Sequence, residues 1–323
     1  MSKMSTDLLQ SPHRRGCIIS GETMGTRYSA KFVADRVDQT VVGAALFAAV
    51  DAVDRQMSTW KPDSDLSRLN AAPVGRWVKV PPELAIVLAE ALRIGRASGG
   101  SFEIAVGDAV NAWGFGPAKP RERPQPGIAP ASARRPAAES LEFDEAGEYV
   151  RKLAPVDLDL CGIAKGFGVD ELARSLERFG ITSYLVGIDG ELRARGRKAD
   201  GMPWTVAIER PDHETRDVMG VLELSDAAVA TSGDYRHWVE LAGARLSHTM
   251  DPRTGEPLRN RIASVTVLAS NCMEADAWAT ALMVMGEEAG PDFAQARGLD
   301  ALFIIREKEG LVERAVGCFA GKN

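Results

Sequence analysis

Apolar residues recur at helical spacing in several segments of this chain. The segment 41–57 repeats valine, alanine and leucine every three or four positions, as one face of a helix requires. The same spacing predicts further helices at 82–98, 166–179 and 274–285. Glycines that can adopt a left-handed conformation follow two of these segments and mark their ends. A short helix is also expected at the end of 58–70, capped by Asp63 or Ser64.

The remaining apolar runs are short and separated by turn signals, which is typical of β-strands joined as hairpins. An Asp-Gly turn divides 184–196 into two such strands. Further strands are expected at 17–20, 26–33, 141–143, 149–152, 156–160, 204–209, 220–224, 228–232, 238–241, 264–269, 301–306 and 311–315. Because consecutive strands form hairpins and helices interrupt them, the pattern favours an α+β fold on antiparallel sheets over an alternating βαβ fold.

Length and composition describe an ordinary globular protein. The chain has 323 residues, 45% of them apolar and 26% charged. This size allows two domains or one large domain with an internal duplication. Residues 1–17 are expected to be a disordered tail ahead of a folded unit at 18–323. A run rich in proline, arginine and alanine at 117–138 is expected to be a solvated loop within that unit.

Charge, hydropathy and cysteine usage narrow the class of protein. The net charge of −6 gives no reason to expect a nucleic-acid partner, since no basic stripe offsets it. No membrane span is expected, because no stretch approaches about 18 consecutive apolar residues. The N-terminal segment lacks the apolar core of a signal peptide, which makes the cytoplasm the expected location. The four cysteines are scattered without CxxC spacing and are expected to be buried free thiols.

The segment 159–166, Asp-Leu-Cys-Gly-Ile-Ala-Lys-Gly, joins a strand-like run to a predicted helix. We refer to it as the lysine loop. Backbone amides at such a helix start, together with Lys165, form a natural site for a phosphate group. A lysine in the first turn of a helix is more often simply solvated, so this segment alone does not decide between the two interpretations.

Asp276 and Thr280 lie four residues apart in an apolar helical run, so their side chains project from one face. A carboxylate and a hydroxyl in this arrangement can bind a hard cation such as Mg2+, which prefers oxygen ligands. The alternative is a first-turn carboxylate beside a threonine that bonds to its own helix backbone. Burying Asp276 among alanines and a tryptophan would be costly without a partner, which weakens this alternative without excluding it.

His248 lies in the segment 247–255, Ser-His-Thr-Met-Asp-Pro-Arg-Thr-Gly. Histidine titrates near neutral pH and is suited to removing a proton from a hydroxyl nucleophile. The Asp-Pro and Thr-Gly pairs are strong turn signals, so a structural role in a turn is the alternative.

Four segments in their order along the chain resemble the ApbE family of flavin transferases, whose members move FMN from FAD onto a threonine or serine of a protein. They are Gly-Glu-Thr-Met-Gly-Thr at 21–26, the lysine loop, the histidine segment at 247–255, and Glu-Ala-Asp-Ala-Trp-Ala-Thr at 274–280. The resemblance implies a flavin transferase domain at 18–323 with a duplicated antiparallel-sheet architecture of the T-fold type.

The resemblance also implies roles for single residues. Asp276, Thr280 and the backbone carbonyl of Gly162 would bind Mg2+, and His248 would be the base that activates the acceptor hydroxyl. FAD would be held by a larger set: Met24, Trp60, Ser101, Phe102, Glu103, Asp159, Lys165 and Met250.

The chain departs from the usual family pattern near this site. Trp60 replaces a tyrosine and Glu103 replaces an aspartate, while Asp189-Gly190 stands in place of a Gly-Gly pair. Ser247 occupies a position where a second histidine is common. Trp60 still offers an aromatic face on which a flavin or adenine ring can stack.

The function implied by the resemblance is Mg2+-dependent transfer of FMN from FAD to a threonine or serine hydroxyl of an acceptor protein, with release of AMP. The nearest alternative is hydrolysis of FAD to FMN and AMP, because water could replace the acceptor hydroxyl in the same site. A non-catalytic FAD-binding protein is a further alternative. The presence of Lys165 and His248 together with both metal-ligand side chains disfavours it.

Overall fold

The computed structural model describes residues 15–117, 134–211, 217–234, 238–241 and 244–321. Its centre is an eight-stranded sheet in which all neighbouring strands run antiparallel. In sheet order the strands are β1 (Arg15–Thr23), β2 (Thr26–Ala34), β6 (Tyr184–Ile188), β7 (Glu191–Arg195), β10 (Ala227–Gly233), β15 (Ile262–Ala269), β16 (Asp300–Glu307) and β17 (Gly310–Val316). The α+β class and the antiparallel sheet are therefore confirmed.

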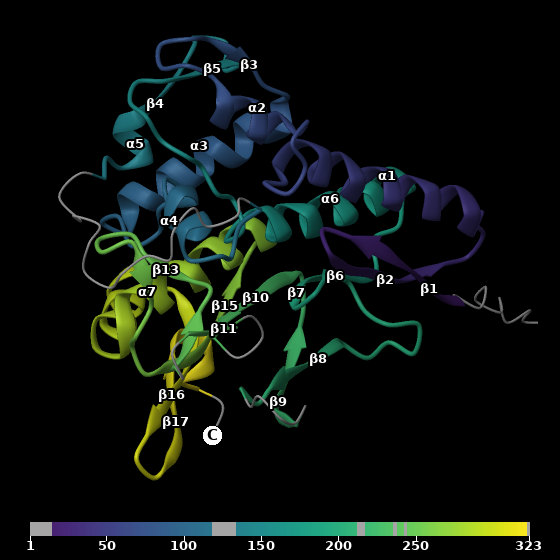
Figure 1. Cartoon of the computed structure of the whole chain (residues 1–323). Helices are drawn as coiled ribbons and strands as arrows, with labels where there is room; N and C mark the ends of the chain where they lie inside the picture. The colour runs from purple at the N-terminus through teal and green to yellow at the C-terminus, as the bar shows by residue number, and fades with distance from the viewer. Residues whose placement is uncertain (1–14, 118–133, 212–216, 235–237, 242–243, 322–323) are drawn as a thin grey trace, which may run out of the picture.

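Three long helices cover one face of this sheet (Figure 1). They are α1 (Gln39–Met57), α6 (Ala164–Arg178) and α7 (Cys272–Arg297). Helices α1 and α6 run side by side near β1, β2 and β6, and α7 packs on β10, β15 and β16. The opposite face is covered by the hairpin of β8 (Trp204–Glu209) and β9 (Val218–Leu224).

Smaller elements extend the core beyond the long helices. The helices are α2 (Asp65–Ala71), α3 (Pro82–Ala97), α4 (Gly107–Ala112) and α5 (Ala137–Ser140), beside a sheet of β3 (Val78–Lys79), β5 (Tyr149–Lys152) and β4 (Leu141–Phe143). Apolar residues of α2 and α3 share one buried cluster with α7. Two short hairpins, β11 (Trp238–Leu241) with β12 (Ala244–Ser247) and β13 (Met250–Asp251) with β14 (Glu256–Pro257), precede β15, and a 3-10 turn (Gly317–Phe319) follows β17.

Local sequence signals explain several element ends. Ser64 is the N-cap of α2 and accepts a hydrogen bond from the Ser67 amide at 3.0 Å, which selects one of the two predicted caps. Gly180 follows α6 with a φ of +71°, in the left-handed region that glycine tolerates. The turn between β1 and β2 consists of Met24 and Gly25, both with positive φ, as a two-residue hairpin turn requires.

Two sequence-based expectations about elements were wrong. The N-terminal tail is shorter than 1–17, because residues from Arg15 onward pair with β2; residues 1–14 lie outside the described part of the chain. Residues 156–160 join no sheet, since other groups take up backbone hydrogen bonds of this segment. The helix predicted at 274–285 does end at Gly286, whose φ of +88° breaks it; a second helical segment that was not predicted follows to Arg297, with the buried Gly290 and Ala294 packed against the core.

Two further expectations were partly right. Cys17 and Cys272 are buried free thiols, but Cys161 and Cys318 are exposed. Most of the proline-rich segment 117–138 lies outside the described residues, and its end forms the short helix α5. Among the described residues, none of the helices combines the length and apolar character needed to cross a membrane.

Candidate functional site

The predicted metal ligands meet where the start of α6 packs against α7. A Cβ on Gly166 would lie 2.3 Å from the carbonyl oxygen of Cys272 and 2.8 Å from the Cβ of Asp276. A Cβ on Gly162 would come within 2.9 Å of the hydroxyl oxygen of Thr280. Any side chain at these two glycines would push the helices apart. Glycine in the lysine loop thus brings its backbone against the two polar side chains of α7.

The atoms at this contact that are predicted to bind the metal are all oxygens. The buried carboxylate of Asp276 accepts a hydrogen bond from the Gly166 amide at 3.0 Å, and no other hydrogen bond engages it within the described chain. The Thr280 hydroxyl shares a 3.1 Å hydrogen bond with the hydroxyl of Ser232 in β10. A carboxylate, a hydroxyl and the nearby carbonyl of Gly162 form the kind of ligand set that Mg2+ prefers. The residues present therefore fit this ion.

Charges around the contact favour a bound cation. Burial raises the pKa of Asp276, the negative charge of Glu191 raises it further, and Lys165 opposes both effects. Glu191 is itself buried at the start of β7. Two carboxylates in a poorly solvated region repel each other, and a divalent cation would relieve this repulsion.

Lys165 is held by two carboxylates from the turn between β6 and β7. Its Nζ atom lies 2.8 Å from Glu191 Oε1 and 3.6 Å from Asp189 Oδ2. Burial alone would lower the pKa of Lys165, but the charges of Glu191, Asp276 and Asp189 outweigh it and raise the pKa. The ammonium group is therefore charged, as phosphate binding needs. Asp189, which departs from the family pattern, adopts a φ of +58°.

A buried ion pair anchors the first turn of α7. The carboxylate of Asp170 in α6 accepts hydrogen bonds from the amides of Cys272 and Met273, both at 3.0 Å, and lies 2.7 Å from the Arg193 guanidinium. These amides have no partner within their own helix, so Asp170 satisfies them from outside. Asp276 follows one turn later. Asp170 was not predicted from the sequence, although an aspartate on the apolar face of α6 was a usable signal.

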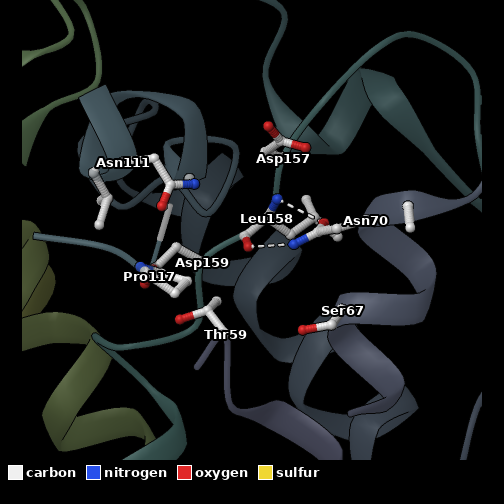
Figure 2. A pocket seen from close by; sticks show the side chains of 11 residues that line it. Thr59, Ser67, Asn70, Asn111, Pro117, Asp157, Leu158 and Asp159 are labelled. Carbon is white, nitrogen blue, oxygen red and sulfur yellow. Dashed lines mark hydrogen bonds between the residues drawn. The ribbon is translucent and has the colours of Figure 1, made fainter. Parts of the chain in front are cut away.

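A pocket of about 270 Å³ lies beside the lysine loop (Figure 2). Asp159 lines it, together with residues of α2, α4 and the segment 157–158. The side-chain amide of Asn70 fixes this wall, because it donates to the Leu158 carbonyl at 2.9 Å and accepts from the Leu158 amide at 2.8 Å. Asp159 and Gly162 are three residues apart, which spans at most about 11 Å. The pocket is therefore adjacent to the predicted metal ligands.

The other residues predicted to bind FAD are spread around this region. The Phe102 ring lies 3.3 Å from the position that a Cβ on Gly162 would take. Glu103 Oε1 accepts hydrogen bonds from the amides of Ala105 and Ala137, and burial raises the pKa of this carboxyl. Trp60 follows Thr59, which lines the pocket, and is 63% exposed. Ser101 is half-buried at the end of the turn after α3.

Met24 and Met250 lie on different elements. The Met24 Cε atom would be 3.2 Å from a Cβ on Gly168, so this turn residue packs on α6. Met250 is buried in β13 and pairs with Pro257.

The half-buried His248 precedes a hairpin, residues 249–258, that is fixed at both ends. At its tip the indole N–H of Trp113 donates to the Gly255 carbonyl at 2.9 Å. The guanidinium of Arg134, 3.0 Å from Asp108 of α4, also lies against Gly255. Just beyond its base, the Asn260 amide donates to the Met283 carbonyl of α7 at 2.7 Å.

Contacts thus join the region of His248 to two helices. The hairpin tip contacts the end of α4, which lines the pocket, and Asn260 contacts α7, which carries Asp276 and Thr280. The Trp113 contact was not expected from the sequence.

Comparisons with known proteins identify the family. The ApbE family model matches residues 24–303, which is most of the chain. The chain belongs to the ApbE family. An FAD:protein FMN transferase of Vibrio cholerae serotype O1 is 40% identical over 308 residues, covering 93% of this chain and 91% of that protein. One from Klebsiella pneumoniae is 37% identical over 305 residues, covering 93% and 87%.

A solved structure gives the same result for the fold. The flavin transferase ApbE from Vibrio cholerae superposes with a TM-score of 0.85 at 39% identity, covering 95% of this chain and 99% of that one. The mixed architecture of helices on antiparallel sheets is therefore that of an ApbE protein.

Proposed function

We propose that this protein transfers FMN from FAD to a threonine or serine hydroxyl of an acceptor protein in a Mg2+-dependent reaction that releases AMP. The observation that carries the proposal is the meeting of Asp276, Thr280 and Gly162 at the contact between α6 and α7. Membership of a family whose relatives are named FAD:protein FMN transferases supports the same reaction.

Asp276, Thr280 and the Gly162 carbonyl are the proposed metal ligands. When bound, Mg2+ would neutralise negative charge on the pyrophosphate oxygens. Ser232 would orient the Thr280 hydroxyl, since the two oxygens share a hydrogen bond. Asp170 would hold the first turn of α7 and so the position of Asp276.

FAD would extend from the metal ligands into the 270 Å³ pocket beside Asp159. The charged ammonium of Lys165 would face the pyrophosphate, in competition with its present carboxylate partners. Trp60 keeps an exposed ring face at the edge of this region, on which one of the two FAD ring systems would stack.

In the proposed reaction the acceptor oxygen attacks the phosphorus of the FMN half. The bond from this phosphorus to the bridging oxygen breaks, and AMP leaves with the electron pair. His248 takes the proton of the acceptor hydroxyl. The protein contributes position and charge stabilisation, as in phosphoryl transfer generally.

The test combines purified protein, FAD, MgCl2 and a candidate acceptor, with a variant acceptor that lacks the hydroxyl as the control. Covalent flavin fluorescence on the acceptor after denaturing electrophoresis is the expected result. Free FMN and AMP without labelling would indicate hydrolysis, and unchanged FAD would indicate a binding protein.

The variant Asp276→Ala tests the metal ligands. We expect it to abolish transfer while FAD binding survives in weakened form, because the pyrophosphate loses its bound counter-charge. Transfer rate and FAD affinity are measured at increasing Mg2+. Wild-type activity of this variant after EDTA treatment would contradict the assignment.

A further inference from the structure

A second cavity, of about 580 Å³, lies between the 249–258 hairpin and the second half of α7. We infer that this groove receives the segment of the acceptor protein that carries the modified hydroxyl. The inference rests on the proposed function and assigns the place at which the protein substrate enters.

The walls of the groove are the hairpin next to the proposed base and the helix that carries two of the proposed metal ligands. One wall is the hairpin that follows His248, with Asp251 and Leu258 among its lining residues. The other is α7, from Val284 onward. Val284 follows Thr280 by one helical turn, or about 6 Å along the axis. The groove therefore begins about one helical turn beyond Thr280 and runs along the hairpin that follows His248.

The first pocket is bounded by different elements, namely α2, α4 and residues 157–159. In phosphoryl transfer the entering and leaving oxygens lie roughly in line on opposite sides of the phosphorus. A leaving AMP held near Asp159 therefore requires an acceptor that approaches from another side. The groove supplies such an approach, because none of its lining residues is shared with the first pocket.

The charge of the groove favours a protein segment over a second nucleotide. Four carboxylates line it, and only two arginines. Both arginines are already paired, Arg253 with Asp251 at 3.0 Å and Arg259 with Glu256 at 3.7 Å, and Arg261 pairs with Glu287 at 2.9 Å, so Glu288 leaves one negative charge in excess. A phosphate-rich ligand would be repelled here, whereas a polar or basic peptide would not.

The break in α7 adds backbone groups for a peptide to contact. Gly286 has a φ of +88° and a ψ of 178°, which interrupts the helical hydrogen-bond ladder at the groove wall. Amides after such a break and carbonyls before it lack partners within the helix, although the Asn260 side chain already binds the Met283 carbonyl. An extended segment can satisfy such groups with its own main chain, a common mode of peptide recognition.

The test fills the groove without touching the proposed catalytic residues. Ala289 lines the groove and is exposed, so Ala289→Trp adds bulk at the wall. Ala296→Trp is the matched control, because Ala296 is also exposed on the second half of α7 but does not line the groove. Steady-state transfer is measured with acceptor and FAD varied separately, and FAD affinity and FAD hydrolysis without acceptor are measured alongside.

We expect Ala289→Trp to raise KM for the acceptor at least tenfold, with KM for FAD and FAD affinity within twofold of wild type. Ala296→Trp should match wild type in all four measurements. If both variants keep the wild-type KM for the acceptor, the groove is not the acceptor site. If the wild-type protein labels no acceptor but still cleaves FAD, the proposed transfer itself fails, which is a distinguishable result.

Discussion

Replacing Trp113 with phenylalanine tests whether the hairpin after His248 must be held at its tip. The change removes the indole N–H that donates to the Gly255 carbonyl at 2.9 Å and keeps an aromatic ring. Gly255 is buried, so its carbonyl is left without this partner in a poorly solvated place. Leaving a buried acceptor unsatisfied costs about 1–3 kcal/mol. We expect a stability loss of this size.

The effect on catalysis should be larger than the effect on FAD binding. Gly255 belongs to the turn that starts three residues after His248, and freeing this turn lets the imidazole shift. A displacement of about 1 Å in an active site costs roughly 100-fold in rate. Trp113 does not line the first pocket. We therefore expect transfer to fall by about 10-fold to 100-fold while FAD affinity stays within about twofold.

The chain offers a matched control for this variant. The indole N–H of Trp204 donates to the Arg195 carbonyl at 3.0 Å on the opposite face of the sheet. Trp204→Phe removes the same kind of hydrogen bond far from the proposed site. Urea unfolding and single-turnover transfer are measured for both variants. If Trp113→Phe transfers flavin as fast as Trp204→Phe, Trp113 has only a structural role and the reasoning is wrong.

Three further predictions use residues described above. His248→Ala should lower the transfer rate by about 10²-fold to 10⁴-fold, which is the contribution of a positioned base, and should change FAD affinity far less. An equal loss of transfer rate and FAD affinity would show that His248 has a structural role. Lys165→Met should weaken FAD binding more than riboflavin binding in titrations, since riboflavin has no phosphate, and equal losses would remove the pyrophosphate role. Glu103 has a pKa raised by burial above the usual 4.5. The Glu103 carboxyl therefore loses its proton at a lower pH in the unfolded chain than in the folded protein. The free energy of unfolding falls as the pH rises from 4.5 towards the pKa of the folded state. Glu103→Gln keeps an oxygen acceptor for the Ala105 and Ala137 amides and should gain stability over wild type through that pH range in urea unfolding; a constant difference across the range would exclude this titration.

Helical periodicity places Asp276 and Thr280 on one face, and the resemblance to the ApbE family assigned these two residues and Gly162 to the metal. The contacts that support these ligands could not be predicted from the sequence. Ser232 and Thr280 are 48 residues apart, and Trp113 and Gly255 are 142 apart. Nothing in a single sequence pairs residues at such separations.

The wrong predictions have the same origin. Residues 156–160 have the composition of a strand, but the Asn70 side chain takes the hydrogen bonds that a neighbouring strand would have made. The helix predicted at 274–285 does end at Gly286, but the segment that follows was not predicted because Pro291 lies within it. This segment is helical to Arg297 despite the proline, and its Ala294 packs against the core. Local propensity is a weak guide wherever tertiary contacts satisfy the backbone differently.

The charges at the contact between α6 and α7 link the proposed metal to the proposed substrate. When Asp276, Glu191 and Asp189 are ionised, the single ammonium of Lys165 leaves two negative charges in excess. A pyrophosphate would be repelled from such a region, particularly since Asp276 and Glu191 are buried. One divalent cation balances this excess and frees Lys165 to interact with phosphate oxygens. The residues of this chain therefore favour binding of the metal and of FAD together, rather than of FAD alone.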